Sequence, residues 1–251
     1  METNLIYALH GFLGLPSDWE TWRKKLVPSD SRFISIDLWN DPILNCSLSF
    51  SDWTKAFINQ VKLQIHGVNS HPCKISLWGY SMGGRLALSA LTQAPELFHH
   101  AMILSANPGL DDQLERVNRL QKDLEWAEKF LSQDLPWSLL MEEWDQQPVF
   151  NLPDAMGDSP KPLVNFESAT KFYRKETDFD RTRLAMALDH WSIARQPNLW
   201  LDLNKINFPI DWHVGSLDEK YVAIAKRAQS VNSLIRLTIH KNRGHRLLEK
   251  L

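Results

Sequence analysis

The chain has 251 residues, with 28 lysines and arginines against 30 aspartates and glutamates, and its formal net charge is −2. This balance argues against nucleic-acid binding and against a basic membrane-binding face, and no apolar run is long enough to cross a membrane. The two cysteines cannot form a disulfide framework, so we expect reduced thiols. The sequence therefore predicts a soluble, cytoplasmic protein with one catalytic core that acts on a small molecule.

The amino-terminal part of the chain predicts alternating strands and helices. Short apolar runs indicate strands, and apolar residues at helical spacing indicate amphipathic helices. The predicted elements are a strand at 5–9, a helix at 17–26, a strand at 32–37, a helix at 50–65, a strand at 74–78 followed by a helix, and a strand at 101–105. Such an alternation predicts a parallel sheet with helices packed on it.

A G-x-S-x-G pattern, Gly79-Tyr80-Ser81-Met82-Gly83, follows the strand at 74–78 and opens the next helix. In serine hydrolases this pattern makes a strained turn that holds the serine hydroxyl above the sheet. We therefore interpret Ser81 as a nucleophile or base, the alternative being a small buried turn. The glycine-containing loop His10–Gly14 follows the first strand, and such a loop supplies one N–H of an oxyanion hole. We expect the N–H groups of Phe12 and Met82 to form that hole, with His10 shaping the loop.

The middle of the chain has a different pattern, with long charged helices and no convincing strand between Asp111 and Arg195. An all-helical piece between two α/β parts predicts a cap inserted over the strand ends. The expected division is a core of residues 1–108 and 196–251 and a helical cap of residues 109–195. Caps of this kind usually determine substrate choice, because they close over the site.

The core pattern resumes with a strand at 210–215, a helix at 221–229 and a strand at 235–239. Ser81, Asp218 and His245 each follow the carboxyl end of a predicted strand, where ligands of open α/β sheets bind. Their order along the chain is that of α/β-hydrolases. In that arrangement His245 takes the proton of the Ser81 hydroxyl, and Asp218 fixes the tautomer and stabilises the imidazolium.

Other residues compete for the acid and base positions. Nine histidines are present, but His245 alone follows a glycine in a loop after the last strand. Asp211 lies at the wrong end of its strand, so Asp218 is favoured as the acid, with Glu219 as the alternative. The sequence contains no metal-ligand spacing and no phosphate-binding or dinucleotide fingerprint, so we expect no cofactor and no metal.

Six short motifs are specific when they are taken together. They are His10–Gly14, Gly79–Arg85, Asn107–Leu110 followed by Arg116 and Arg119, Trp144–Phe150, Arg195–Leu199 and Gly215–Lys220. This set resembles the MenH family, which is 2-succinyl-6-hydroxy-2,4-cyclohexadiene-1-carboxylate (SHCHC) synthase of menaquinone and phylloquinone biosynthesis. The resemblance extends from the first strand to His245 and implies an α/β-hydrolase fold, with a mostly parallel central sheet flanked by helices and an inserted helical cap.

The resemblance implies a lyase on a hydrolase scaffold. The family eliminates pyruvate from 2-succinyl-5-enolpyruvyl-6-hydroxy-3-cyclohexene-1-carboxylate, with the triad serine as base, no covalent acyl intermediate and no cofactor. The resemblance also implies the triad and oxyanion roles given above. A substrate with several carboxylates needs guanidinium groups that can bind them in a bidentate way. The matching substrate positions are Tyr80, Arg85, Arg119, Trp144 and Arg174, with Lys175 as the alternative to Arg174.

Three of these positions have structural alternatives. Arg85 could be a solvated residue of the first helical turn, Arg119 a charge on an exposed helix face, and Trp144 a core ring. The segment after Asp37 also departs from the family, since it reads Leu-Trp-Asn-Asp in place of Pro-Gly-His-Gly. Only residues 246–251 follow His245, where the fold usually adds a closing helix, so we expect His245 to be less well supported.

Two further functions share this pattern. A carboxylesterase or carbon–carbon bond hydrolase would use the same triad with a different cap, and a ligand-binding α/β-hydrolase fold would bind without turnover. A neutral ester would not need Arg85 and Arg119, so the charges favour the lyase. We expect a monomer or weak dimer that binds neither nucleic acid nor membrane.

Overall fold

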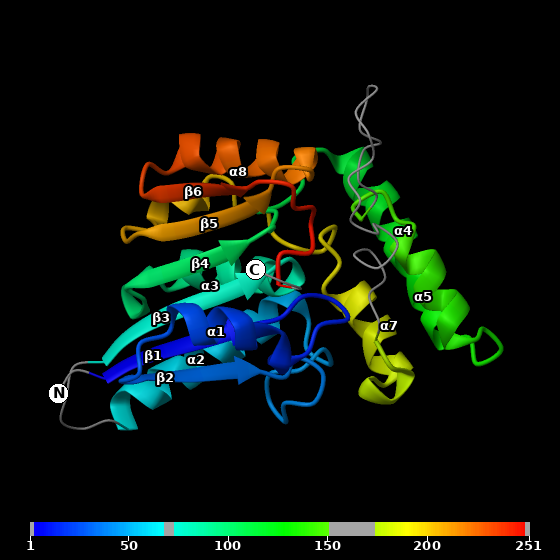
Figure 1. Cartoon of the computed structure of the whole chain (residues 1–251), viewed down its shortest axis with the longest axis horizontal. Helices are drawn as coiled ribbons and strands as arrows, with labels where there is room; N and C mark the ends of the chain where they lie inside the picture. Colours follow the sequence, from blue (N-terminus) through cyan, green and yellow to red (C-terminus); the bar gives the residue numbers. More distant parts are fainter. Residues whose placement is uncertain (1–2, 68–72, 151–173, 249–251) are drawn as a thin grey trace.

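A parallel sheet of six strands forms the centre of the protein (Figure 1). The computed structural model describes residues 3–67, 73–150 and 174–248. The strand order is β2-β1-β3-β4-β5-β6, and every neighbouring pair is parallel. The predicted α/β fold with a parallel sheet is confirmed. The strands are β1 (Thr3–Leu9), β2 (Ser31–Ile36), β3 (Cys73–Tyr80), β4 (His100–Leu104), β5 (Ile210–Gly215) and β6 (Ile235–His240).

Helices cover both faces of this sheet, and further helices lie beyond the carboxyl ends of its strands (Figure 1). The α-helices are α1 (Glu20–Leu26), α2 (Phe50–Gly67), α3 (Met82–Gln93), α4 (Gln113–Leu131), α5 (Trp137–Asp145), α7 (Arg181–His190) and α8 (Glu219–Val231). The short 3-10 helices are η1 (Pro16–Trp19), η2 (Pro95–Leu97), η3 (Glu176–Asp178) and η4 (Asp202–Lys205).

The two faces of the sheet contribute to two buried clusters, because successive strand residues point to opposite sides. Leu5 and Leu9 of β1 belong to the larger cluster, which contains buried residues of α2 and α3. Ile6 and Ala8 belong to the smaller cluster, which includes Trp22 of α1. The strands are therefore apolar on both faces, as expected for a parallel sheet covered by helices on each side.

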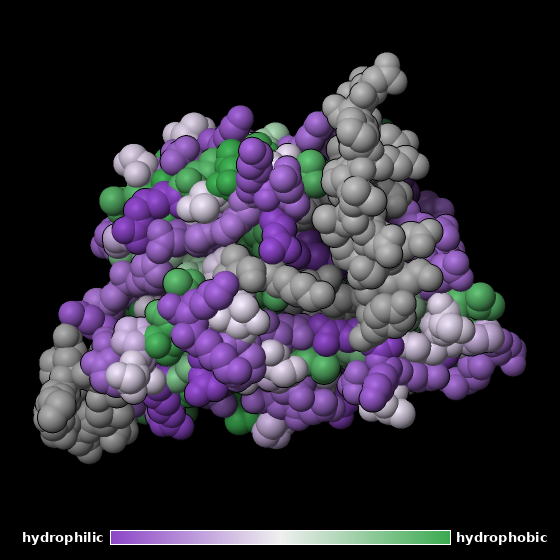
Figure 2. All heavy atoms as spheres, viewed as in Figure 1, coloured by the Kyte–Doolittle hydropathy of each residue, from purple (hydrophilic) through white to green (hydrophobic). Residues whose placement is uncertain are grey.

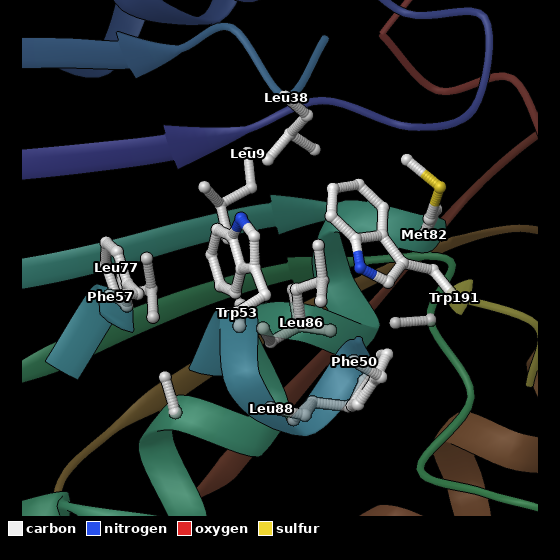
Figure 3. Packing of buried hydrophobic residues seen from close by; sticks show 14 of the residues in the cluster. Leu9, Leu38, Phe50, Trp53, Phe57, Leu77, Met82, Leu86, Leu88 and Trp191 are labelled. Carbon is white, nitrogen blue, oxygen red and sulfur yellow. The ribbon is translucent and has the colours of Figure 1, made fainter. Parts of the chain in front are cut away.

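Tryptophans link the sheet to the helices beyond it. Trp53 of α2 and Trp191 at the end of α7 are fully buried, with ring centroids 6.2 Å apart in an edge-to-face arrangement. Figure 3 shows these two indoles with Leu86 of α3 between them in that view. Burying such rings removes a large apolar area from water, so this packing fixes the end of α7 against α3.

Helices α4, α5 and α7 lie beside the carboxyl ends of the strands (Figure 1), and α4 packs against α7. These helices occupy the part of the sequence for which a cap is predicted. Residues 151–173 of that predicted cap lie outside the described residues, and the division into residues 1–108, 109–195 and 196–251 stays a prediction.

Several element boundaries differ from the sequence-based expectation. Strand β3 continues through Tyr80, because its pairing with β1 and β4 extends across Gly79. The first predicted helix is divided into η1 and α1. Helix α8 begins at Glu219 because Asp218 caps it, its side chain accepting from the N–H of Tyr221.

The face of the molecule viewed in Figure 1 is largely hydrophilic, with smaller hydrophobic areas between the polar ones (Figure 2).

Cys46 is a buried free thiol, and burial raises the pKa of this thiol to about 11. None of the described helices combines the length and the apolar character needed to cross a membrane.

Candidate active site

Ser81 lies in a sharp turn between β3 and α3, with backbone angles φ +50° and ψ −111°. A positive φ is uncommon for a non-glycine residue and marks a strained position. The backbone N–H of Ser81 donates to the carbonyl of Leu104 at 2.8 Å, which fixes the turn to β4. A Cβ at Gly83 would lie 2.3 Å from the carbonyl oxygen of His10, so only glycine allows α3 to approach β1 this closely.

Ser81, His245 and Asp218 form a continuous chain of hydrogen bonds. The Ser81 Oγ lies 3.0 Å from His245 Nε2, and His245 Nδ1 lies 2.7 Å from Asp218 Oδ2. The carboxylate can only accept, so Nδ1 carries a proton for Asp218 and Nε2 of a neutral imidazole accepts from the serine hydroxyl. The His245 and Asp218 side chains are 4% and 5% exposed. The structure thus brings together the three side chains predicted to form a triad.

The loop that carries His245 is held firmly by its neighbours. The backbone N–H of Leu217 donates to the carbonyl of Arg243 at 2.9 Å. Three rings surround the imidazole, with centroids 4.4 Å (Tyr221), 5.9 Å (Tyr80) and 6.1 Å (Phe150) from that of His245. The expectation of a weakly supported His245 is therefore wrong, because side chains from β3, α8 and the segment after α5 enclose the ring.

His10 shapes the loop after β1, as the sequence suggested. Its Nδ1 lies 2.9 Å from the carbonyl oxygen of Gly11, and its Nε2 accepts from the N–H of Leu38 at 3.1 Å. These partners require a neutral ring with the proton on Nδ1, and burial lowers the pKa of His10. His10 therefore acts as a fixed bridge between two loops and does not change charge.

Phe12 and Met82 both line the cavity described below, close to Ser81 in the fold. Met82 is the first residue of α3, and the first N–H groups of a helix have no acceptor within it. The positive end of the helix dipole also favours negative charge at this point. These features fit an oxyanion hole, although the assignment of Phe12 and Met82 to it stays a prediction.

A cavity of about 1120 Å³ lies between the carboxyl ends of the strands and helices α4 and α5. Its wall contains all three members of the hydrogen-bonded chain, so the serine hydroxyl is open to a small molecule. Of the predicted substrate positions, Tyr80, Arg85, Arg119 and Trp144 contribute to the same wall. This juxtaposition places a proton acceptor and two guanidinium groups around one enclosed space.

Arg85 is half-buried one turn into α3, where its guanidinium is held by hydrogen bonds to the protein and is not fully solvated. Its Nη1 donates to Gln196 Oε1 at 3.1 Å and its Nη2 to the carbonyl of Trp191 at 2.7 Å. Both partners are neutral, and within the described part of the chain no carboxylate pairs with Arg85. Burial, helped by the positive charge of Arg119, lowers the pKa of Arg85 to about 10. The group still carries its charge at neutral pH, and among the described residues its direct hydrogen-bond partners are both neutral, while Asp123 acts on it only through space.

Arg119 differs from Arg85 because its charge is paired. Its Nε donates to both carboxylate oxygens of Asp123, at 2.9 and 3.0 Å, and Asp123 also accepts from the Ser192 hydroxyl at 2.7 Å. Burial opposes protonation, but the Asp123 carboxylate outweighs it and raises the pKa of Arg119. The Arg119 side chain is 47% exposed, so the guanidinium remains accessible from the cavity.

Arg174 and Trp144 occupy different surroundings. Arg174 forms an ion pair with Asp18, with Nη2 2.5 Å from Oδ2, and it is not among the residues that line the cavity. Its substrate contact therefore stays a prediction, as does that of Lys175. Trp144 belongs to the buried core cluster and also lines the cavity, with its ring 4.7 Å from that of Phe12. It is both a core residue and a wall residue.

Sequence reasoning missed two residues that shape this site. Gln196 is fully buried; it accepts from Arg85, and its Nε2 donates to the carbonyl of Asn107 at 3.1 Å. Tyr221 packs on His245 and lines the cavity. Gln196 lies in the motif Arg195–Leu199, and Tyr221 lies three residues after Asp218. Both residues are therefore close in sequence to positions that the sequence analysis singled out. Their partners, however, are distant in sequence.

The model of the α/β hydrolase fold family matches residues 4–156, and the chain belongs to that family. A protein of Serratia proteamaculans (strain 568), named 2-succinyl-6-hydroxy-2,4-cyclohexadiene-1-carboxylate synthase, is 29% identical over 222 residues, which are 88% of this chain and 79% of that protein. A protein of the same name from Salmonella paratyphi B is 31% identical over 172 residues, which are 68% of this chain and 61% of that protein. These relatives confirm the resemblance to the MenH family.

Solved structures share the fold. MenH from S. aureus superposes with a TM-score of 0.78 at 22% identity, covering 99% of this chain and 90% of that chain. A carboxylesterase of the thaumarchaeon Nitrososphaera gargenis gives a TM-score of 0.69 at 15% identity, covering 98% and 84%. Because a MenH protein and a carboxylesterase both match at less than 25% identity, the likeness establishes the architecture alone, and the chemistry has to be argued from the cavity.

Proposed function

We propose that this chain is a carbon–oxygen lyase that eliminates pyruvate from 2-succinyl-5-enolpyruvyl-6-hydroxy-3-cyclohexene-1-carboxylate to give SHCHC. The observation that carries this proposal is the half-buried Arg85, whose direct partners among the described residues are neutral, in the same cavity as the Ser81–His245–Asp218 chain. Removing part of the water around a cation without pairing it to a counterion costs free energy, and an anionic substrate offsets that cost. The relatives named SHCHC synthase support the same reaction.

In this reaction Ser81 is the base. His245 Nε2 takes the hydroxyl proton, and the Ser81 oxygen removes a proton from the substrate ring. The electron pair of the broken C–H bond forms a ring double bond, and the C–O bond to the enolpyruvyl group breaks. The leaving group takes that bond's electrons, receives the proton that His245 took from Ser81, and is released as pyruvate. Asp218 stabilises the imidazolium while His245 holds this proton, and no cofactor takes part.

The remaining residues provide charge and shape. Removal of the ring proton creates an enolate-like oxygen, for which the N–H groups of Phe12 and Met82 are the proposed donors. Arg85 binds a substrate carboxylate, and Arg119 binds a second one while Asp123 holds its orientation. Tyr80 and Trp144 form the part of the cavity wall that contacts the substrate ring. Arg174, which is paired with Asp18, is a further proposed substrate-binding residue. We also propose a cytoplasmic location and a monomer or weak dimer.

An ester hydrolase would use the same three residues in another way. Its serine would attack a carbonyl carbon and form an acyl-enzyme, and a neutral ester would leave the charge of Arg85 unbalanced. The uncompensated guanidinium therefore favours the lyase over the carboxylesterase.

Two assays on the same preparation test the proposal. Pyruvate release from the enolpyruvyl substrate is followed with lactate dehydrogenase and NADH, and hydrolysis of p-nitrophenyl acetate is followed by absorbance. We expect pyruvate release with a kcat/KM in the ordinary enzyme range, above about 10⁴ M⁻¹s⁻¹, and ester hydrolysis without a burst. An acyl-enzyme burst with no pyruvate release would contradict the lyase proposal and would favour a hydrolase.

A further inference from the structure

Tyr221 is placed against the catalytic-site histidine by the start of helix α8. Asp218 caps that helix, and its Oδ1 lies 3.4 Å from the backbone N of Tyr221. Tyr221 is the third residue of the helix. Its ring centroid is 4.4 Å from that of His245, at an interplanar angle of 58°. This is the shortest of the three ring contacts that surround the imidazole.

The other end of Tyr221 faces the cavity. Tyr221 lines the cavity wall together with Arg85 and Arg119, and the charges of both guanidinium groups act on its phenol. Burial outweighs these charges and raises the pKa of Tyr221, so at neutral pH the phenol is protonated and can donate. Within residues 3–67, 73–150 and 174–248, the phenol oxygen has no hydrogen-bond partner.

Tyr221 is partly buried and its side chain lines the cavity, so its hydroxyl can donate to a ligand that enters there. The chemistry of the surrounding wall indicates what the partner is. Two guanidinium groups recruit anionic oxygen, and the phenol adds a neutral donor between them and His245. A carboxylate oxygen can accept from both kinds of group at once.

We propose that Tyr221 is a further substrate-binding residue, whose hydroxyl donates to a carboxylate oxygen held by the arginines while its ring fixes the His245 imidazole. The proposal rests on the proposed function, since it takes a carboxylate of that substrate as the ligand. It connects the part of the cavity that binds charge to the part that moves the proton. One side chain then sets both the substrate position and the orientation of the base.

Two substitutions separate the hydroxyl from the ring. Tyr221→Phe removes only the donor, and Tyr221→Leu removes both the donor and the ring. Tyr7→Phe is the matched control, because Tyr7 is buried in the core against Phe57, with ring centroids 5.4 Å apart, and does not line the cavity. Pyruvate release reports on substrate binding, and the rate of Ser81 labelling by a neutral fluorophosphonate reports on the serine–histidine pair. Thermal unfolding of each variant establishes that it is folded.

For Tyr221→Phe we expect kcat/KM for pyruvate release to fall about 10-fold to 100-fold, as for a lost hydrogen bond to a charged group, with the labelling rate within about twofold of wild type. For Tyr221→Leu we expect labelling to slow as well, about 10-fold. An unchanged kcat/KM in Tyr221→Phe would overturn the role of the hydroxyl, and unchanged labelling in Tyr221→Leu would overturn the role of the ring. Absence of pyruvate release in wild type would instead refute the proposed function.

Discussion

Two histidine–aspartate pairs lie at opposite ends of strand β5. At its carboxyl end, His245 Nδ1 lies 2.7 Å from Asp218 Oδ2, and at its amino end, His100 Nε2 lies 2.7 Å from Asp211 Oδ2. The two pairs have the same chemistry and the same hydrogen-bond length. They differ in exposure, since the side chains of the first are 4% and 5% exposed and those of the second both 28%.

The difference shows what the fold adds to a simple histidine–aspartate hydrogen bond. Asp211 also accepts from Arg236 at 2.7 Å, so its charge is shared with a cation, whereas Asp218 accepts from His245 and from a backbone N–H. The Nε2 atom of His245, which does not contact Asp218, lies 3.0 Å from Ser81 Oγ. Both side chains line a cavity at the carboxyl ends of the strands, which is where parallel sheets bind ligands. Burial, a serine partner and access to substrate, rather than the bond itself, distinguish the proposed catalytic pair.

The largest effect is expected when the two aspartates are changed in parallel. Asp218→Asn should lower kcat/KM for pyruvate release by about 1000-fold or more, because the amide no longer fixes the His245 tautomer or stabilises its charge. Asparagine is also a good helix cap, so α8 should stay folded. Asp211→Asn should leave the rate within about twofold. Both variants are measured in the pyruvate assay. Equal losses of activity would contradict the assignment of a catalytic role to Asp218 alone of the two aspartates.

The next largest effect on pyruvate release is expected when Arg85, near the carboxyl-end pair, and Arg236, near the amino-end pair, are replaced in parallel. Arg85→Ala should lower kcat/KM about 10-fold to 100-fold, because a charge-assisted hydrogen bond to the substrate is lost. Arg236→Ala, which removes the partner of Asp211, should leave turnover unchanged. Steady-state kinetics of both variants with the enolpyruvyl substrate provides the measurement. A larger loss for Arg236→Ala than for Arg85→Ala would contradict the assignment of Arg85.

His213, which lies on β5 between the two pairs, predicts a dependence of stability on pH. Burial, helped by His240, lowers its pKa to about 4, while Asp211 raises it and His100 lowers it. Between about pH 6.5 and pH 4 the unfolded chain binds more protons at this residue, so the free energy of unfolding falls as the pH is lowered. The loss should be roughly 2 to 3 kcal/mol by pH 4.

Urea unfolding of wild type and His213→Gln at pH 7 and pH 4.5 checks this dependence. The substituted protein should lose less stability than wild type over that interval, because it lacks the group that has to be protonated. His213 Nδ1 lies 3.0 Å from His240 Nε2, so His240→Gln is a useful companion variant. Identical pH dependence in wild type and His213→Gln would place the effect elsewhere.

The smallest effect is expected for His100→Gln, which removes the other member of the amino-end pair. A partly exposed polar contact contributes little, so the free energy of unfolding should fall by less than about 1 kcal/mol. Pyruvate release should be unaffected. Thermal unfolding together with the pyruvate assay tests this, and a loss of activity comparable to that of Asp218→Asn would give the amino-end pair a role it is not assigned here.

Sequence patterns predicted much of the fold and placed the members of the hydrogen-bonded chain, because Ser81, Asp218 and His245 each follow a strand end. The parallel order of the strands then brings the ends together. The surroundings of the arginines could not be predicted in the same way. Arg85 meets Gln196 and the carbonyl of Trp191 more than a hundred residues away, and no local pattern encodes such partners.

The same limit applies to the surroundings of Arg174 and His245. The ion pair of Arg174 with Asp18 joins the predicted cap to η1 of the core, and it depends on how those parts pack. Support for His245 was underestimated because it comes from side chains such as Tyr221 rather than from a following helix. Tertiary packing determines these contacts, whereas the turn at Ser81 is determined locally by glycines and a strained backbone.

The central claim is that Ser81 acts as the base in an elimination. Pyruvate release by Ser81→Ala, compared with wild type at saturating enolpyruvyl substrate, tests that claim most directly. The account predicts a fall in rate of at least about 100-fold in a protein with unchanged thermal stability. A Ser81→Ala protein that releases pyruvate at the wild-type rate would contradict it.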